Sequence, residues 1–283
     1  MSEKLTVGGQ AVIEGVMMMS KNNIATAIRA PTGEIILNVD KFDSLSNKPL
    51  FKLPFIRGIV SLVEMTYIGM QTLSWSANQQ DESGEQISTL QLALTVGLSL
   101  LLSIAIFILL PYALTYVITS QQTLTFNLID GIFRLLIFTA YLSGIGLMSD
   151  VHRIFQYHGA EHKTVNCYES GKELTPQNVL SASRIHPRCG TSLLVFVMAI
   201  SIVLFSIIKS SYWYVNIALR ILLIPVISGI SYEFIKFSSR STSAFLKACI
   251  KPGLLTQELT TREPTREQVE VAIKALNHVI TAE

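Results

Sequence analysis

A long segment without charged residues constrains this chain more than any other feature. No Asp, Glu, Lys or Arg occurs in residues 86–129, whereas such residues make up about a quarter of an average soluble domain. Over all 283 residues the charged share is 15% and the apolar share is 49%. This composition excludes a purely soluble protein. It also excludes a disordered chain, which combines low hydrophobicity with high net charge.

Four apolar segments are long enough to cross the hydrocarbon core of a bilayer, which takes roughly 17 to 25 helical residues. They cover residues 90–110, 132–148, 191–208 and 213–232, and Pro111 is expected to close the first. Most of the 22 Lys and Arg residues lie before the first segment, in residues 149–190 and after residue 235. Because cytoplasmic loops carry an excess of positive charge, we expect a multi-pass protein of the cell membrane with both termini and the 149–190 loop in the cytoplasm.

Charge and cysteine content exclude further classes. The net charge is only +2 and no long block of Lys and Arg occurs, so we expect no nucleic-acid partner. The three cysteines, Cys167, Cys189 and Cys249, are too few and odd in number for a disulfide framework.

The N-terminal region predicts β structure. Apolar runs at residues 11–16, 24–28 and 34–39, with a turn at 30–33, are typical of a small sheet. We expect this sheet to lie in the cytoplasm, before the first apolar segment.

Two amphipathic helices are also predicted outside the spans. Residues 54–73 have helical periodicity interrupted by Arg57 and Glu64, which indicates an interfacial or re-entrant helix, followed by a loop at 74–85. A capping box at Thr265 and Gln268 begins a C-terminal helix whose apolar stripe docks on the sheet, on a partner or on the bilayer.

The expected fold is therefore a mainly α-helical integral membrane protein with four transmembrane helices, an interfacial or re-entrant amphipathic helix and a small cytoplasmic β-sheet near the N-terminus. Its regions are a β-rich segment (1–50), the interfacial helix and loop (51–85), two spans (86–148), a His/Cys loop (149–190), two more spans (191–235) and a C-terminal cytoplasmic segment (236–283).

A histidine cluster in the 149–190 loop is the main indication of chemistry. In the sequence HGAEH, His158 and His162 are one helical turn apart and are spaced to chelate one metal ion. Glu161 completes an H-x-x-E-H pattern, in which the carboxylate takes a proton from water instead of binding the metal. We expect a divalent metal, zinc by preference, with Glu161 as the catalytic base.

The third metal ligand stays open. The preferred candidates are His186, Cys189 and Glu169, and weaker ones are His152 and Glu233. In the opposing interpretation the histidines only bond the loop backbone, and Gly159 breaks any helix at 158–162.

Several polar residues are candidates for binding a substrate. Lys163, Arg184 and Arg188 bring positive charge to the cluster, which suits a small anionic molecule or a lipid headgroup. Near the N-terminus, Gln10 and Glu14 stand among glycines that permit close approach of a ligand to the backbone. A purely structural turn is the alternative there.

Five separated motifs run through the chain: GGQAVIEGVMM (8–18), YHGAEHKTVNCYE (157–169), HPRCGTS (186–192), ISYEFIKFSS (230–239) and the segment 251–273. Together they resemble the YqhQ-like family of bacterial multi-pass membrane proteins, described as predicted metal-dependent enzymes. The resemblance implies an enzyme of this kind without a defined substrate. The motif positions here are Gly9, Gln10, Glu14, His158, Glu161, His162, Asn166, Cys167, His186, Arg188 and Cys189.

Four functions are compatible with these features. The first is a membrane-bound metal-dependent hydrolase acting at the cytoplasmic face. The second is a non-enzymatic scaffold or assembly factor with structural histidines and a protein partner or a second copy of the chain. A transporter and a metal-sensing protein are the other two, although few ionisable groups lie in the spans to form a polar pathway.

Overall fold

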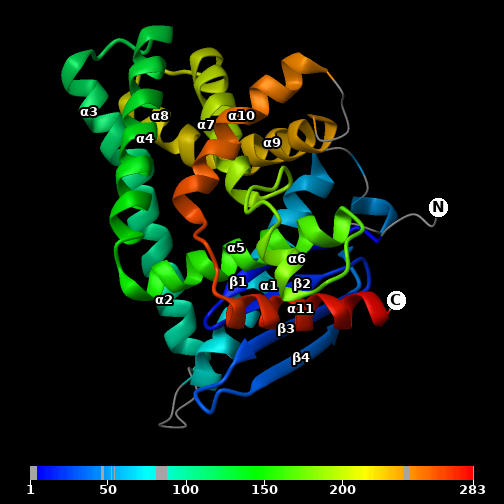
Figure 1. The fold of residues 1–283 in the computed structure, drawn as a ribbon. Helices are drawn as coiled ribbons and strands as arrows, with labels where there is room; N and C mark the ends of the chain where they lie inside the picture. Colours follow the sequence, from blue (N-terminus) through cyan, green and yellow to red (C-terminus); the bar gives the residue numbers. More distant parts are fainter. Residues whose placement is uncertain are drawn as a thin grey trace.

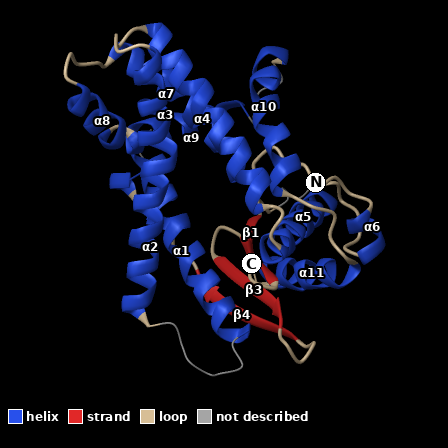
Figure 2. Ribbon diagram, turned by 90° about the vertical axis from the view of Figure 1, so that its left-hand side faces the viewer, coloured by secondary structure: helices blue, strands red, loops and turns tan. Residues whose placement is uncertain are grey.

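The chain forms a set of long apolar helices and, at one end of them, a small sheet covered by helices (Figures 1 and 2). The computed structural model describes residues 5–45, 48–51, 53, 55–80, 88–238 and 243–282.

The sheet is an antiparallel meander of four strands in chain order, which confirms the expected N-terminal sheet. Its strands are β1 (Gly8–Val12), β2 (Gly15–Met19), β3 (Asn23–Arg29) and β4 (Ile35–Lys41), so β1 is an edge strand. The expected run over residues 11–16 is wrong, because the chain reverses at Ile13 and Glu14, where Glu14 has a φ of 53°. Apolar residues lie on both sides of Glu14 and Gly15, and they concealed the reversal in the hydropathy pattern.

Helices cover both faces of the sheet. On one face lie α5 (Ser149–Glu169) and α11 (Arg266–Thr281), the red helix in front of the strands in Figure 1. On the other face α1 (Ile56–Gln80) contributes Ile68 and Trp75 to a second apolar cluster with residues of β1, β2 and β3.

The C-terminal helix docks on the sheet. It begins at the predicted capping box, in which Thr265 and Gln268 cap each other's backbone N–H groups. Its apolar residues Val269, Leu276 and Val279 have no exposed surface. Of the three targets that the amphipathic pattern allowed, the structure selects the sheet.

The helix after the sheet is longer than expected. It runs to Gln80, so the loop predicted from residue 74 is wrong as far as 80, and residues 81–85 lie outside the described part of the chain. Ser76 explains the difference, because it is buried and its Oγ accepts a hydrogen bond from the backbone N–H of Ile13 at 3.2 Å. The polar residues predicted to form a loop instead contact the sheet region, Ser76 at the turn after β1 and Gln80 at the carbonyl of Arg29 in β3.

Three helices are long and apolar enough to cross a membrane: Leu90–Ile118, Leu124–Ile145 (α4) and Gly190–Ile207 (α7). The first combines α2 (Thr89–Ile104), a π-helical turn (Ala105–Leu109) and α3 (Leu110–Ile118). A further pair, α8 (Trp213–Leu222) and α9 (Ile224–Ser238), is bent by 46° and passes the same test only when its two helices are taken together, as a broken span or a re-entrant loop.

Two predicted span boundaries are corrected. Pro111 does not end the first helix, because the preceding π-helical turn accommodates its ring and its missing N–H. The second helix begins at Leu124, after Thr123 as N-cap, and not at residue 132. The earlier start places Asp130 inside the helix.

A buried ionic cluster connects α4 with α7 and α8. The Oδ2 atom of Asp130 accepts hydrogen bonds from Arg134 at 2.9 Å and from Arg220 at 2.8 Å. Arg220 also donates to Asn127 at 2.9 Å, and Arg134 donates to Ser201 at 3.1 Å. The charges inside these apolar helices are thus paired, Arg134 with Asp130 within α4 and Arg220 with Asp130 between α8 and α4.

Two helices complete the surroundings of the histidine cluster. The short α6 (Pro176–Leu180) packs on α5, and α10 (Ala244–Thr260) packs on α7. A 3₁₀ turn at Pro49–Phe51 precedes α1.

Candidate metal centre

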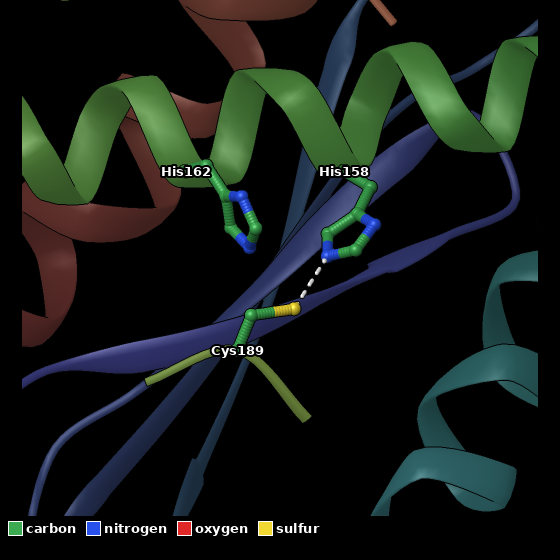
Figure 3. Close-up of side chains that lie close together, drawn as sticks. All are labelled: His158, His162 and Cys189. Atoms are coloured by element: carbon green, nitrogen blue, oxygen red, sulfur yellow. Dashed lines mark hydrogen bonds between the residues drawn. The ribbon is translucent and has the colours of Figure 1, made fainter. Parts of the chain in front are cut away.

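Two histidines project from one face of α5. The H-x-x-E-H segment lies inside this uninterrupted helix, so His158 and His162 are one turn apart, with ring centroids separated by 4.4 Å. Figure 3 shows both rings directed from α5 toward Cys189. The predicted pairing of these two side chains is therefore present in the fold.

Gly159 does not break the helix. A Cβ atom at this position would lie 2.0 Å from the carbonyl oxygen of Arg262, and the N–H of Arg262 donates to the carbonyl of Phe155 at 2.8 Å. The segment that follows α10 therefore crosses α5 in backbone contact. The glycine is required by this crossing, and its modest helix propensity is outweighed by the packing.

Hydrogen bonds fix the orientation of both imidazole rings. The Nδ1 atom of His158 lies 2.8 Å from the carbonyl oxygen of Thr260, and Nδ1 of His162 lies 2.6 Å from that of Arg184. A carbonyl oxygen only accepts, so each Nδ1 carries a proton, and Nε2 is the ring nitrogen that is left to bind a metal. This arrangement is the one that metal-binding histidines commonly have.

Cys189 brings a sulfur atom close to the Nε2 atoms of the two histidines. It is the N-cap residue of α7, and its Sγ lies 3.3 Å from Nε2 of His158 and 3.2 Å from Oγ1 of Thr191. The ligand atoms of His158, His162 and Cys189 all lie within 4.8 Å of one another. Bond lengths to zinc place N and S ligands of one tetrahedral ion about 3.6 Å apart, so this donor set fits such an ion.

The loop that carries Cys189 is held by a buried glutamine that the sequence analysis missed. The side chain of Gln257 in α10 accepts from the N–H of His186 and donates to its carbonyl, both at 2.8 Å, and it also donates to Ser192 at 3.1 Å. Its side chain is fully buried. One amide thus fixes the loop on both sides of Cys189, and no local sequence signal marks such a long-range contact.

Glu161 lies beside the three donor atoms. Its Oε2 is 3.5 Å from Nε2 of His162, and the side chain is only 6% exposed. Burial raises the pKa of its carboxyl, whereas His158 and His186, when they are protonated, and Arg188 act in the opposite direction. A carboxyl in this position can accept and return a proton next to the candidate metal.

The other predicted ligands form a separate network. Nε2 of His186 lies 3.4 Å from Oε2 of Glu169, and Glu169 also forms an ion pair with Arg188. The hydrogen bond from His186 is the main cause that lowers the pKa of Glu169, followed by the charge of Arg188. Glu169 is thus engaged with its own partners, while the ring of His186 lies 5.8 Å from that of His162.

The residues predicted to bind a substrate divide into two groups. Gln10 and Arg188 line the cavity beside the histidines. Lys163, Arg184 and Glu14 are held elsewhere. Lys163 donates to the carbonyls of Leu180 and Ala182, Arg184 binds Thr261 and Glu258, and Glu14 pairs with Arg153.

The cavity has a volume of about 590 Å³ and contains all three donor residues together with Glu161. Its walls come from β1, β2, α1, α5 and the start of α7. Apolar side chains dominate it, including Met17, Met19 and Met65. The centre is therefore accessible to a molecule larger than water.

Comparison with known proteins assigns the chain to a family. Residues 53–282 match the family model described as "Protein of unknown function (DUF1385)". The chain belongs to this family. It is also 35% identical over 295 aligned positions to the "Uncharacterized protein YqhQ" of Bacillus subtilis (strain 168). This alignment covers 98% of this chain and 92% of that protein. This likeness agrees with the YqhQ-like motifs. No solved structure matches the chain.

Proposed function

We propose that this protein is a membrane-bound metal-dependent hydrolase whose metal is held by His158, His162 and Cys189. The observation that carries the proposal is the position of buried Glu161 beside three convergent donor atoms at the wall of a large cavity.

The number of donors favours catalysis over a purely structural metal. Structural zinc sites are closed by four protein ligands, whereas catalytic sites use three and leave one position open. Among the described residues, the cluster offers three. A metal sensor or a metal-stabilised scaffold would be better served by a fourth protein ligand.

Each residue of the centre has a distinct role in the proposal. A divalent ion such as zinc, when bound here, supplies Lewis acidity toward a carbonyl or phosphoryl oxygen and toward water. The carbonyls of Thr260 and Arg184 hold the imidazoles in the binding tautomer. Glu161 takes the proton of the attacking water and returns it to the leaving group.

We further propose that the broken pair α8–α9 is a fourth span and that both termini are cytoplasmic. The excess of Lys and Arg in residues 149–190 and in both terminal regions supports this orientation. Because Cys189 is the N-cap of α7, the centre then lies at the cytoplasmic surface of the cell membrane. Lipids and membrane-bound polymers are therefore within its reach.

Metal content tests the proposal. Protein purified in detergent without added metal is expected to contain about one zinc or other divalent ion per chain by mass spectrometry, and His158→Ala and His162→Ala are expected to lose it. Glu161→Gln should keep the metal, because this carboxyl is not a ligand in the proposal.

His152→Ala is the matched control, since this exposed histidine of α5 lies outside the cluster. Wild-type protein that contains no metal, and takes up none of zinc, manganese or iron on reconstitution, would contradict the proposal.

A further inference from the structure

The edge of the sheet beside the metal centre has backbone groups without partners. In antiparallel strands, residues alternate between those that bond the neighbouring strand and those that face away from it. Val12 and Gly15 flank the two-residue turn between β1 and β2 and therefore form a hydrogen-bonded pair. Counting back in steps of two, the backbone N–H and C=O groups of Val12, Gln10 and Gly8 point toward β2. Gly9 and Ala11 therefore direct their N–H and C=O groups outward from β1.

The protein itself satisfies the two ends of this edge. The carbonyl of Val7 accepts a hydrogen bond from Arg188 at 3.2 Å, and the N–H of Ile13 donates to Ser76 at 3.2 Å. Between these ends, in the part of the chain that the structure describes, the outward groups of Gly9 and Ala11 have no hydrogen-bond partner. An exposed edge of this kind is a template for adding a strand.

The free edge lies at the proposed reaction centre. Gly9 and Ala11 both line the cavity that contains His158, His162 and Cys189. A Cβ atom on Gly9 would lie 3.1 Å from Oε1 of Glu161, so this carboxyl packs directly against the middle of β1. A segment paired with Gly9 and Ala11 would pass beside the catalytic carboxyl and the metal.

The walls on both sides of the edge suit apolar side chains. A strand added to β1 would direct alternate side chains to opposite faces of the sheet. On the α1 face the cavity presents Met65 and Met19, and on the α5 face it presents Ile154 and Phe155. Methionine side chains adapt to varied apolar partners, so the site is expected to be tolerant in sequence.

We propose that the substrate of the metal centre is an extended polypeptide segment with apolar side chains, bound by strand addition to β1 through Gly9 and Ala11. This inference rests on the proposed hydrolase function and names its substrate class. The reaction is then the hydrolysis of a peptide bond. The oxygen of water adds to the carbonyl carbon, the C–N bond breaks, and the proton taken by Glu161 passes to the leaving nitrogen, giving a carboxylic acid and an amine. The acid then loses the second proton of water to the amine, which leaves a carboxylate and an ammonium group.

Three forms of one labelled peptide test the mode of binding on the full-length chain in detergent. The peptide is short, made of Val, Ala and Leu, and is prepared unmodified, with every second amide N-methylated and with every amide N-methylated. Strand addition uses only one edge of the peptide, so the alternately methylated form should bind within about threefold of the unmodified one. The fully methylated form should bind at least tenfold more weakly, since it has no N–H group left to donate to the carbonyls of Gly9 and Ala11.

Ala11→Pro tests the protein side, because proline removes the outward N–H and leaves the pairs of Gln10 and Val12 with β2 intact. It should weaken binding of the unmodified peptide about tenfold. Gly8→Ala is the control, since a Cβ there meets no atom within 4 Å. Equal binding of all three peptides, as expected for a lipid-like ligand, or no binding of any, would overturn the proposal.

Zinc content and cleavage are measured on the same samples, by mass spectrometry. The expected methylation pattern in protein that takes up no metal supports strand addition and contradicts the hydrolase. Cleavage of the unmodified peptide by wild type and not by Glu161→Gln supports both.

Discussion

Sγ of Cys189, at the start of α7, lies 3.3 Å from Nε2 of His158 in the middle of α5, although the two residues are 31 positions apart in the chain. This contact joins the end of a candidate membrane span to the helix that covers the sheet. The proposed metal therefore lies where the apolar helices meet the helix-covered sheet.

A thiolate ligand has a spectroscopic signature. With cobalt in place of zinc, wild-type protein is expected to show a near-ultraviolet sulfur-to-metal charge-transfer band, and Cys189→Ser should lose it. Cys167→Ser is the control, because this buried thiol donates to the carbonyl of Glu173 and lies outside the donor cluster. A band that survives in Cys189→Ser would assign the third ligand to another residue.

Gln257 should act on the metal without touching it. Replacement by Met keeps the volume of the side chain and removes the bonds to His186 and Ser192, so Cys189 loses its support. We expect zinc affinity to fall about 10- to 100-fold, the usual effect of losing an outer hydrogen-bond partner. Competition with a zinc-binding dye measures this change. Unchanged affinity in a folded variant would show that the loop is positioned by other contacts.

Gly159→Ala should destabilise the protein although alanine favours helices by about 1 kcal/mol. The added methyl group would lie 2.0 Å from the backbone oxygen of Arg262, so the segment after α10 must move. Gly144→Ala in α4 is the control, because its Cβ meets no atom within 4 Å. We expect a lower thermal midpoint for the first variant and an equal or higher one for the second.

Asp130→Asn removes the only carboxylate that Arg134 and Arg220 contact in the described residues. Both partners of the Arg220–Asp130 pair are 3% exposed, and breaking a buried pair costs about 3–5 kcal/mol. The variant should therefore have a much lower melting temperature. Arg266→Gln, in a pair with Glu270 at the surface, should change stability by less than about 1 kcal/mol. Similar melting of the two variants would contradict a stabilising role for the cluster.

Glu169 makes stability depend on pH in the acid range. Its pKa is lowered in the folded protein below the ordinary value of 4.5, mainly by the hydrogen bond from His186. The folded state therefore favours the ionised carboxylate, and this stabilisation is present above pH 4.5 and is lost as the pH falls through the lowered pKa. Glu169→Gln should melt at a lower temperature than wild type at neutral pH, and the difference should shrink toward acid. A difference that is constant with pH would show that the charge is not responsible.

Local pattern was sufficient for some elements of the fold and of the site. The turn at residues 30–33, the capping box of α11 and the three apolar helices each depend on neighbouring residues, and each appears in the structure. The spacing of His158 and His162 also predicted that their rings lie together, because a helix places residues one turn apart on one face.

Other features depend on contacts that local pattern does not record. Apolar residues on both sides of Glu14 hid a chain reversal. The polar segment around Ser76 was predicted to be a loop, although Ser76 is bonded to the turn after β1 and Gln80 to β3. Gly159 could be interpreted from the sequence as a helix breaker, whereas in the fold it lets the backbone of Arg262 cross α5 in direct contact.

The sequence by itself determined which chemical groups are available and which segments are apolar enough for a membrane. Only the tertiary structure decided which of three candidates, His186, Cys189 or Glu169, has its donor atom beside the two histidines. Gln257 anchors the loop that carries Cys189. Glu169 is instead bound by Arg188 and His186. The same holds for the free edge at Gly9 and Ala11, since strand pairing decides which backbone groups face outward. Such contacts join residues far apart in the chain, and their geometry exists only once the helices and the sheet have packed.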